Sequence, residues 1–322
     1  MITSLGRAAS AFIIFLAAVT TARAESLAVS VFPGIQNLPL LAAQAQGFFT
    51  RRNLTVEVKV TANSDDLRNG LAAGRFHIVH AAVDNAVAMK KVAESDVAVV
   101  MGGDTGATRL FVRPEIAAVT DLRGRDLAVD ALDTAYAFQL YAMLRQDGLS
   151  PSDYRPVAIG NTIARLRSLL NGTTMAAILN PPFSVEAERS GLRDLGLFTE
   201  RMGPYQGTAA FVLRPWAAAN REALASYLAA YIEGVRWTLD PRHREEVTDL
   251  IAKNLKVDVD VARASYLIAV DPRQGLAPDA ALDQRGFENV LRLRALFVNG
   301  SVGTAADYLD LQYYQAALAL LP

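Results

Sequence analysis

The tetrapeptide Ser26-Leu27-Ala28-Val29 returns about a hundred residues later as Asp126-Leu127-Ala128-Val129, and this repetition decides the fold. Two further stretches recur in the same order and at nearly the same offset. They are Leu71-Ala72-Ala73-Gly74, which returns as Leu169-Leu170-Asn171-Gly172, and Phe111-Val112-Arg113-Pro114, which returns as Phe211-Val212-Leu213-Arg214-Pro215. Each copy has the same type of predicted element around it. An ordered repeat of this kind predicts two similar lobes whose equivalent loops face each other.

Short apolar runs alternate with helical segments through the first two thirds of the chain. Strands are predicted at 27–31, 54–60, 78–79 and 97–101, and again at 127–129, 154–159 and 175–179. Such an alternation predicts a largely parallel sheet with helices on both faces. After Pro215 the alternation stops, and consecutive helices are predicted between 220 and 320.

We therefore expect the α/β class, with two similar α/β lobes joined by two crossing strands. The crossings are expected near 109–114 and 208–215. Lobe 1 is expected to be discontinuous, comprising 25–110 plus 213–322, and lobe 2 to comprise 111–212. The C-terminal helical segment is expected to pack on lobe 1, because the second crossing returns the chain to that lobe.

The first 24 residues have the pattern of a signal peptide. Arg7 precedes an apolar stretch at 8–19, and Ala22-Arg23-Ala24 has the small-x-small form that signal peptidase cuts. The apolar stretch is shorter than the roughly 20 residues that span a bilayer. We expect cleavage after Ala24 and a soluble mature protein in the periplasm, without a lipid anchor because the chain has no cysteine.

Composition excludes several classes of function. Without cysteine, no disulfide framework, thiolate metal site or cysteine nucleophile is possible. The 32 basic and 33 acidic residues are balanced, so no nucleic-acid partner is expected. His77 and His80 would project to opposite faces of one strand, which is unsuited to sharing a metal. No Gly-x-Ser-x-Gly elbow is present. We expect no catalytic residue, no metal and no cofactor.

At the level of motifs, the chain resembles the periplasmic substrate-binding proteins of ABC importers, in the group that binds nitrate, sulfonates, taurine and thiamine precursors. The resemblance covers essentially the whole mature chain. The stretches that carry it are Val31-Phe32-Pro33-Gly34, Gln46-Gly47-Phe48-Phe49, residues 71–78, Leu110-Phe111-Val112-Arg113-Pro114 and residues 121–129. The chain departs from the group at His77 and Met175, where an acidic residue is common.

The resemblance implies a type II periplasmic binding protein whose two lobes close on a small solute. It further implies an ABC permease in the inner membrane as the partner, and a monomer.

Four strand-to-helix turns are expected to meet at the cleft, because ligands of open α/β sheets bind at the carboxyl ends of strands. The turns are 32–37, 82–85, 130–136 and 180–183. Their candidate ligand-binding residues, together with one residue that precedes the second crossing, are Phe32, Gln36, Asn37, Asp84, Asn85, Asp133, Thr134, Tyr136, Asn180, Phe183 and Tyr205.

Each candidate also has a structural alternative. Phe32 and Phe183 would stack on a ligand or fill a core. The asparagines and Thr134 would orient a solute or serve as turn and cap residues. The acids would stabilise helix N-termini. As a test, Phe183→Ala and Asn85→Ala are each predicted to weaken binding without unfolding the protein.

The turns contain Asp84, Asp130 and Asp133 but no Lys or Arg. An anion such as nitrate or a sulfonate would therefore depend on helix N-termini, or on Arg109, Arg113 or Arg165 nearby. A neutral or partly cationic solute, such as a pyrimidine or another small heteroaromatic compound, fits these residues better. Two other functions stay open: a secreted enzyme acting in the same cleft, and a periplasmic sensor subunit.

Overall fold

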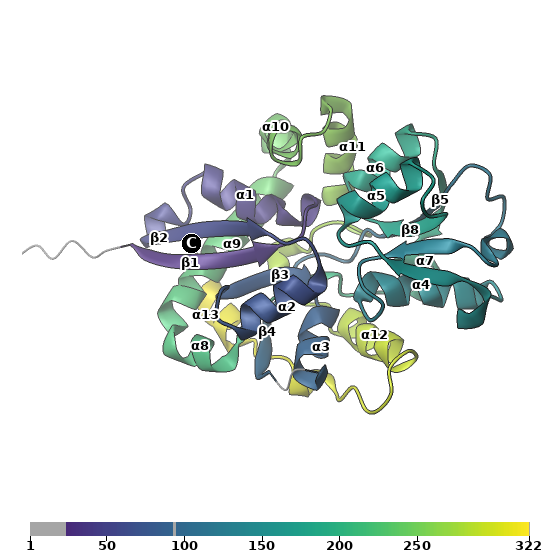
Figure 1. The fold of residues 1–322 in the computed structure, drawn as a ribbon. Coiled ribbons are helices and arrows are strands. Elements are labelled where there is room, and N and C mark those ends of the chain that lie inside the picture. Colours follow the sequence, from purple (N-terminus) through teal and green to yellow (C-terminus); the bar gives the residue numbers. More distant parts are fainter. Residues whose placement is uncertain (1–23, 93–94, 322) are drawn as a thin grey trace, which may run out of the picture.

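Two five-stranded sheets with the same strand topology form the frame of the protein in a computed structural model, which describes residues 24–92 and 95–321 (Figure 1). Of the expected signal peptide, residues 1–24, all but Ala24 lie outside the described part. Within the described part, no helix is both long enough and apolar enough to span a bilayer.

The first sheet has the order β2-β1-β3-β10-β4. Its strands are β1 (Glu25–Val31), β2 (Leu54–Val60), β3 (Ile78–Ala82), β4 (Val97–Met101) and β10 (Thr208–Leu213). The helices between these strands are α1 (Leu38–Ala45), α2 (Ser64–Ala72) and α3 (Asp84–Val92). A short 3₁₀ turn, Ile35–Asn37, precedes α1.

The second sheet has the order β7-β6-β8-β5-β9. Its strands are β5 (Arg109–Val112), β6 (Asp126–Val129), β7 (Arg155–Ala158), β8 (Ala176–Leu179) and β9 (Arg193–Leu197). The helices are α4 (Ala135–Gln146), α5 (Thr162–Leu170), α6 (Phe183–Arg189) and α7 (Phe198–Met202).

The sequence repeat corresponds to equivalent positions in the two sheets, and it confirms the predicted fold class. β1 pairs in parallel with β2 and β3, as β6 does with β7 and β8. β10 runs antiparallel to β3, with Phe211 opposite Val79, and β5 runs antiparallel to β8, with Phe111 opposite Ala177. Each antiparallel strand is supplied by chain that has just left the other sheet. The sheets are therefore largely parallel, with one inserted strand of opposite direction.

The chain crosses between the lobes from β4 to β5 and from α7 to β10. The two crossing segments pair side by side, since Gly207 N–H donates to Asp104 O at 3.0 Å. Residues 109–110 therefore lie in the second sheet and residues 208–212 in the first. The crossings come a few residues earlier in the chain than the sequence predicted, because the apolar runs that follow them are the sheet strands themselves.

The C-terminal helices are α8 (Arg214–Ala219), α9 (Arg221–Leu239), α10 (Arg244–Leu255), α11 (Val259–Ala269), α12 (Gln284–Ala295) and α13 (Gln312–Ala319). As expected, most of this segment packs on lobe 1: α9 lies against α1, and α13 against β4. Two helices also reach lobe 2, since α12 contacts both α3 and α4, and α11 contacts α6 (Figure 1). A hydrophobic cluster runs from Val79 in β3 through Phe287 in α12 to Phe138 in α4. The C-terminal segment thus joins the two lobes on either side of the cleft.

Candidate functional site

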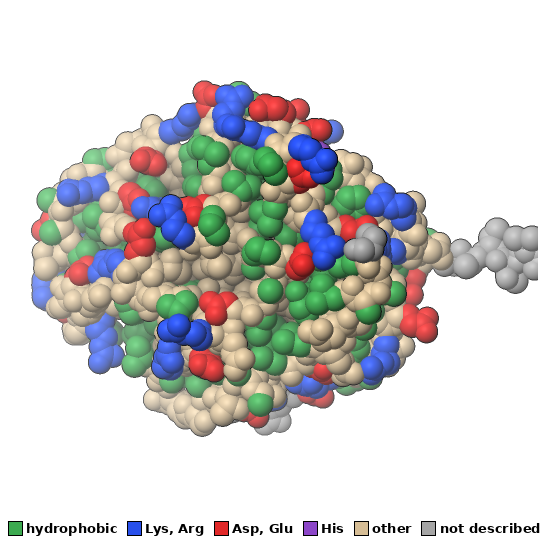
Figure 2. Space-filling model, turned by 180° about the vertical axis from the view of Figure 1, so that it is seen from behind, with side chains coloured by type: hydrophobic (Ala, Val, Ile, Leu, Met, Phe, Trp, Pro, Cys, Tyr) green, Lys and Arg blue, Asp and Glu red, His purple; other side chains and the backbone are tan. Residues whose placement is uncertain are grey.

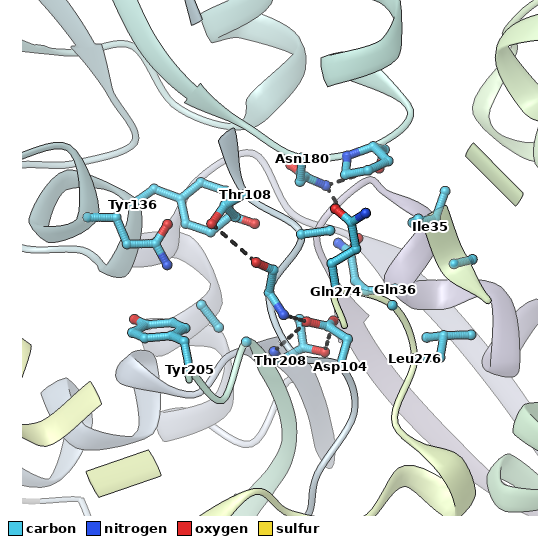
Figure 3. Close-up of a pocket in the computed structure, with 18 residues that line it drawn as sticks. Ile35, Gln36, Asp104, Thr108, Tyr136, Asn180, Tyr205, Thr208, Gln274 and Leu276 are labelled. Atoms are coloured by element: carbon cyan, nitrogen blue, oxygen red, sulfur yellow. Dashed lines mark hydrogen bonds between the residues drawn. The ribbon is translucent and has the colours of Figure 1, made fainter. Parts of the chain in front are cut away.

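Two adjoining cavities lie between the lobes and share the lining residues Gln36, Ala82, Tyr136, Asn180 and Thr208. The first, here named the crossing cavity, is also lined by the crossing residues Asp104, Thr108 and Gly207, by Gln139 and by residues 274–276. Figure 3 shows Tyr136 and Tyr205 on one side of it, Gln36, Ile35 and Leu276 on the other, and Asp104 and Thr208 at the base.

The second, the turn cavity, is lined by residues of the strand-to-helix turns and by the first turns of α2 and α5. These further residues are Phe32, Pro33, Ser64, Asn85, Asp130, Thr134, Thr162 and Arg165. Because parallel strands of one sheet end at the same edge, the turns after β1, β3, β6 and β8 converge here.

Seven of the predicted residues line these cavities: Phe32, Gln36, Asn85, Thr134, Tyr136, Asn180 and Tyr205. Gln36 and Asn180 come from different lobes, and Asn180 Nδ2 donates to Gln36 Oε1 at 3.3 Å. Tyr205 is buried in the wall of the crossing cavity, with its ring edge-on to Phe198. The structure therefore brings predicted residues of both lobes together.

The other four predicted residues lie outside both cavities. Asn37 donates through Nδ2 to Phe32 O at 2.5 Å and so shapes the first turn. Asp84 is buried in an ion pair with Arg294, and half-exposed Asp133 pairs with Arg68 at 3.4 Å. Phe183 is buried in the hydrophobic cluster between α5, α6 and the second sheet.

These four placements have a common cause. The sequence locates a strand-to-helix turn, but only some of its side chains face the cleft, and the others face the core or the outer surface. Asp84 illustrates the consequence for ionisation: burial raises the pKa of its carboxyl group, and the charge of Arg294 opposes that rise.

Arg165, expected as a nearby cation, lines the turn cavity, while several other lining residues were missed as candidates: Ser64, Asp104, Thr108, Gln139, Thr162, Thr208 and Gln274. The repeat itself carried a signal for two of them, because Asn63-Ser64 recurs as Asn161-Thr162 at the same offset. Both asparagines are helix N-caps: Asn63 accepts from Asp66 N–H, and Asn161 accepts from Ile163 and Ala164 N–H. Ser64 and Thr162, which follow the caps, face the turn cavity.

Asp104 is held in the first crossing segment without a cationic partner among the described residues. Its Oδ1 accepts from Gly106 N–H at 2.7 Å and from Thr208 N–H at 3.3 Å, and its Oδ2 bonds to Thr208 Oγ1 at 2.5 Å. Burial raises the pKa of this carboxyl group, and the three hydrogen bonds counteract the rise. The glycine-rich stretch 102–106 is thus part of the first crossing segment, at the base of the cleft.

Asp130 and Arg165 place opposite charges in the turn cavity. Asp130 Oδ2 accepts from Ser64 Oγ at 2.5 Å, a bond between the lobes, while its Oδ1 has no hydrogen-bond partner. Arg165 donates to Gly160 O at 2.6 Å and to Ile178 O at 3.3 Å, and its guanidinium lies over the Tyr136 ring. Burial lowers the pKa of Arg165, and the charge of Asp130 opposes this.

The other candidate cations take no part in the cleft. Arg109 pairs with Asp194 and Arg113 with Glu115. On the outer face drawn in Figure 2, basic and acidic side chains are interspersed without a patch of one sign. The charges that bear on a ligand are therefore those of Asp104, Asp130 and Arg165.

The lobes are closed on each other in this structure. Ile35 N–H donates to Pro181 O at 3.1 Å, and Asn161 N–H donates to Ala62 O at 2.9 Å, both between the lobes. The crossing cavity has a volume of about 30 Å³ and the turn cavity about 40 Å³. One water needs roughly 10–15 Å³ of such space. Only a small chemical group fits either cavity in this arrangement, so a larger solute requires the lobes to separate.

The histidines are structural. His80 is buried, with Nε2 2.9 Å from the Tyr227 hydroxyl, and burial lowers its pKa to about 3. His77 stacks on Trp216 and accepts from Ala28 N–H at 3.1 Å. His243 stacks on Trp237. None of the three lines either cavity.

Comparison with known proteins agrees with this architecture. The model of the NMT1-like family matches residues 20–252. No curated protein matches the chain by sequence.

Solved structures share the fold at low identity. A protein from Bordetella bronchiseptica is 20% identical with a TM-score of 0.78, covering 92% of this chain and 97% of that chain. The periplasmic nitrate-binding protein NrtA from Synechocystis is 13% identical with a TM-score of 0.77, covering 92% and 89%. The alkanesulfonate-binding protein SsuA from Xanthomonas axonopodis, bound to MOPS, is 18% identical with a TM-score of 0.74, covering 90% and 99%.

Proposed function

The chain belongs to the NMT1-like family, and from this premise we propose that it is the solute-binding receptor of an ABC importer. It captures a small organic solute between its two lobes and delivers it to a permease in the inner membrane. The periplasm is the proposed location, with the signal peptide removed after Ala24. The structures of similar fold include proteins named for binding nitrate and alkanesulfonates.

The observation that carries the proposal is the composition of the cleft. Its walls come from both lobes and from both crossing segments, and Gln36 of one lobe meets Asn180 of the other. A solute that contacts both walls binds the closed form more tightly than the open form. This difference in affinity is what shifts the population toward closure.

A receptor is favoured over an enzyme by the side chains in the cleft. No histidine lines the cavities, and Ser64 Oγ is bonded to a carboxylate that belongs to the opposite lobe. The groups present are therefore those of a binding site: amides, hydroxyls, aromatic rings and charges that orient a solute.

The proposal is tested by calorimetric titration of the mature chain with small nitrogen heterocycles, amines, sulfonates and nitrate, followed by analysis of each bound compound. We expect saturable binding, recovery of the compound unchanged, and a smaller radius of gyration in solution scattering when it is bound. Accumulation of a chemical product would instead identify an enzyme.

A further inference from the structure

The lining of the cleft contains more carboxyl groups than cationic groups. Asp104 and Asp130 contribute two carboxylates, and Arg165 contributes the one guanidinium that the lining of the two cavities contains. Two arginines behind the cleft already form ion pairs, Arg294 with Asp84 and Arg68 with Asp65 and Asp133. Burial raises the pKa of Asp104, and the hydrogen bonds from Gly106 and Thr208 oppose that rise. A solute entering the cleft therefore meets more carboxyl groups than cationic side chains.

The carboxyl groups of Asp104 and Asp130 both influence one residue, Tyr136. Tyr136 lines both cavities. Burial is the largest cause that raises the pKa of its hydroxyl; the charges of Asp104 and Asp130 add to the rise, and the charge of Arg165 opposes it. One small molecule beside Tyr136 would thus experience both acids.

Buried acceptor atoms in the cleft lack a donor. Asp130 Oδ1 and Gln139 Oε1 have no hydrogen-bond partner, although Asp130 is only 7% exposed and Gln139 only 1%. The Thr162 hydroxyl, also buried and without a partner, faces the turn cavity beside Asp130. Burying an acceptor without a donor is unfavourable. The two acceptor-only atoms, Asp130 Oδ1 and Gln139 Oε1, are satisfied by a ligand that presents N–H groups.

Arg165 is poorly placed to balance the acids for an anionic ligand. Two of its three guanidinium nitrogens donate to the backbone carbonyls of Gly160 and Ile178. The positive charge of Arg165 also interacts with the negative charge of Asp130, which partly offsets it. An anion in the turn cavity would meet the charge of Asp130 as well as that of Arg165, because both residues line it.

Building on the proposed receptor function, we propose that the solute is a small organic cation: an amine, an amidine or a protonated amino-heterocycle. Its N–H groups are accepted by Asp130 Oδ1 and Gln139 Oε1. Its apolar body lies against Phe32 and the ring of Tyr136, which line the turn cavity. The chemistry of this cleft disfavours a nitrate ion or a sulfonate head group.

The test uses probes that share one shape and differ in charge. Acetamidinium, acetamide and acetate form one series, benzamidinium, benzamide and benzoate a second, and nitrate and methanesulfonate represent the oxyanions. Each is titrated into the mature chain by calorimetry or ligand-observed NMR. We expect the amidinium of each series to bind at least about tenfold more tightly than the amide or the carboxylate, since hydrogen bonds to charged groups are the stronger ones.

Two variants separate the charge of Asp130 from its bond to Ser64. Asp130→Asn keeps an oxygen for Ser64 and removes the charge. It should weaken amidinium binding about tenfold to a hundredfold, leave the amides nearly unchanged and strengthen binding of the carboxylates. Ser64→Ala removes the bond between the lobes and keeps the charge, so it should change the affinities of amidinium and amide by the same factor.

The possible failures are distinguishable. Tighter binding of nitrate, methanesulfonate or the carboxylates than of the amidinium ions would overturn the cationic solute and leave the receptor function standing. An equal loss for all three charge types in Asp130→Asn would also overturn it, because Asp130 would then act only through closure. No binding of any probe would contradict both proposals.

Discussion

Arg294 of α12 donates to Asp84 Oδ2 at 2.8 Å, with both side chains 3% exposed, and it also donates to Asp133 O at 3.3 Å. Asp84 begins α3 of lobe 1, and Asp133 lies in the turn before α4 of lobe 2. One C-terminal side chain therefore bonds to both lobes directly behind the cleft. Neither Arg294 nor its helix was a sequence candidate, because only the fold brings α12 between α3 and α4.

Replacing Arg294 with methionine should destabilise the protein strongly. The substitution leaves the Asp84 carboxylate buried and unpaired, which typically costs about 3–5 kcal/mol. Urea denaturation monitored by circular dichroism measures this loss. The double variant Arg294→Met, Asp84→Asn should recover much of it, and a double variant no more stable than Arg294→Met would contradict the pairing argument.

The stability of the single variant Arg294→Met should also depend on pH differently from that of the wild type. Burial already raises the pKa of Asp84 in the folded state, and loss of the opposing Arg294 charge should raise it further. The folded variant then binds a proton that the unfolded chain has released, so its stability should fall as pH rises above about 4. Arg294→Met should therefore lie closest to the wild type in acid, as denaturation at several pH values would show.

In the wild type, His80 should make the stability rise with pH, which is opposite to the effect of Asp84 in Arg294→Met. Its pKa is lowered from 6.5 to about 3 by burial, so the unfolded chain binds a proton that the folded protein excludes. Stability is lost as pH falls below 6.5, by about 1.4 kcal/mol per pH unit for this group. His80→Gln keeps a partner for the Tyr227 hydroxyl and should remove this part of the slope. An unchanged slope between pH 6 and pH 4 would show that other groups dominate.

The architecture could be predicted because it depends on patterns that the sequence repeats. Strand-helix alternation and the recurrence of Phe111 at Phe211 indicate two like sheets, and both phenylalanines lie in the inserted antiparallel strands. The exact crossing points could not be predicted, since strand order in a sheet is a long-range property. Asp104 and Thr208 were therefore not predicted as ligand-binding residues. They meet only because the two crossing segments pair.

Within the site, a residue was predicted correctly where its position in a turn alone brings its side chain to the cavities. Prediction failed where the orientation of the side chain determines whether it lines them. Gln36, Asn85 and Asn180 lie in predicted turns and line the cavities. Asp84 lies one residue before Asn85 but points to Arg294 instead. Arg165 is in the first turn of α5 and reaches the cleft by a long side chain. The sequence placed Arg109, Arg113 and Arg165 near the turns, but packing decides that only Arg165 lines a cavity.

Asn180→Ala should weaken solute binding by loosening the closed form. Asn180 Nδ2 bonds across the lobes to Gln36 Oε1 at 3.3 Å and to Pro33 O at 3.4 Å. A net hydrogen bond contributes about 0.5–1.5 kcal/mol, which corresponds to roughly twofold to tenfold in affinity. Calorimetry gives the affinity, and solution scattering of the unliganded protein should show a larger radius of gyration. Equal radii for wild type and variant would mean that these bonds do not set the closed population.

Phe183→Ala and Asn85→Ala should now behave differently, although the sequence predicted the same effect for both. Phe183 is 4% exposed and packs with Leu166, Leu169 and Leu179, so its truncation leaves a cavity in lobe 2. That loss is expected to cost about 3–5 kcal/mol of stability. Asn85 lines the turn cavity and donates to Ala82 O at 3.3 Å, so its removal should reduce affinity while the unfolding midpoint changes little. Urea melts and calorimetry of the two variants in parallel decide the matter. A Phe183→Ala protein with wild-type stability and weakened binding would show that Phe183 contributes to the ligand site and not to the core.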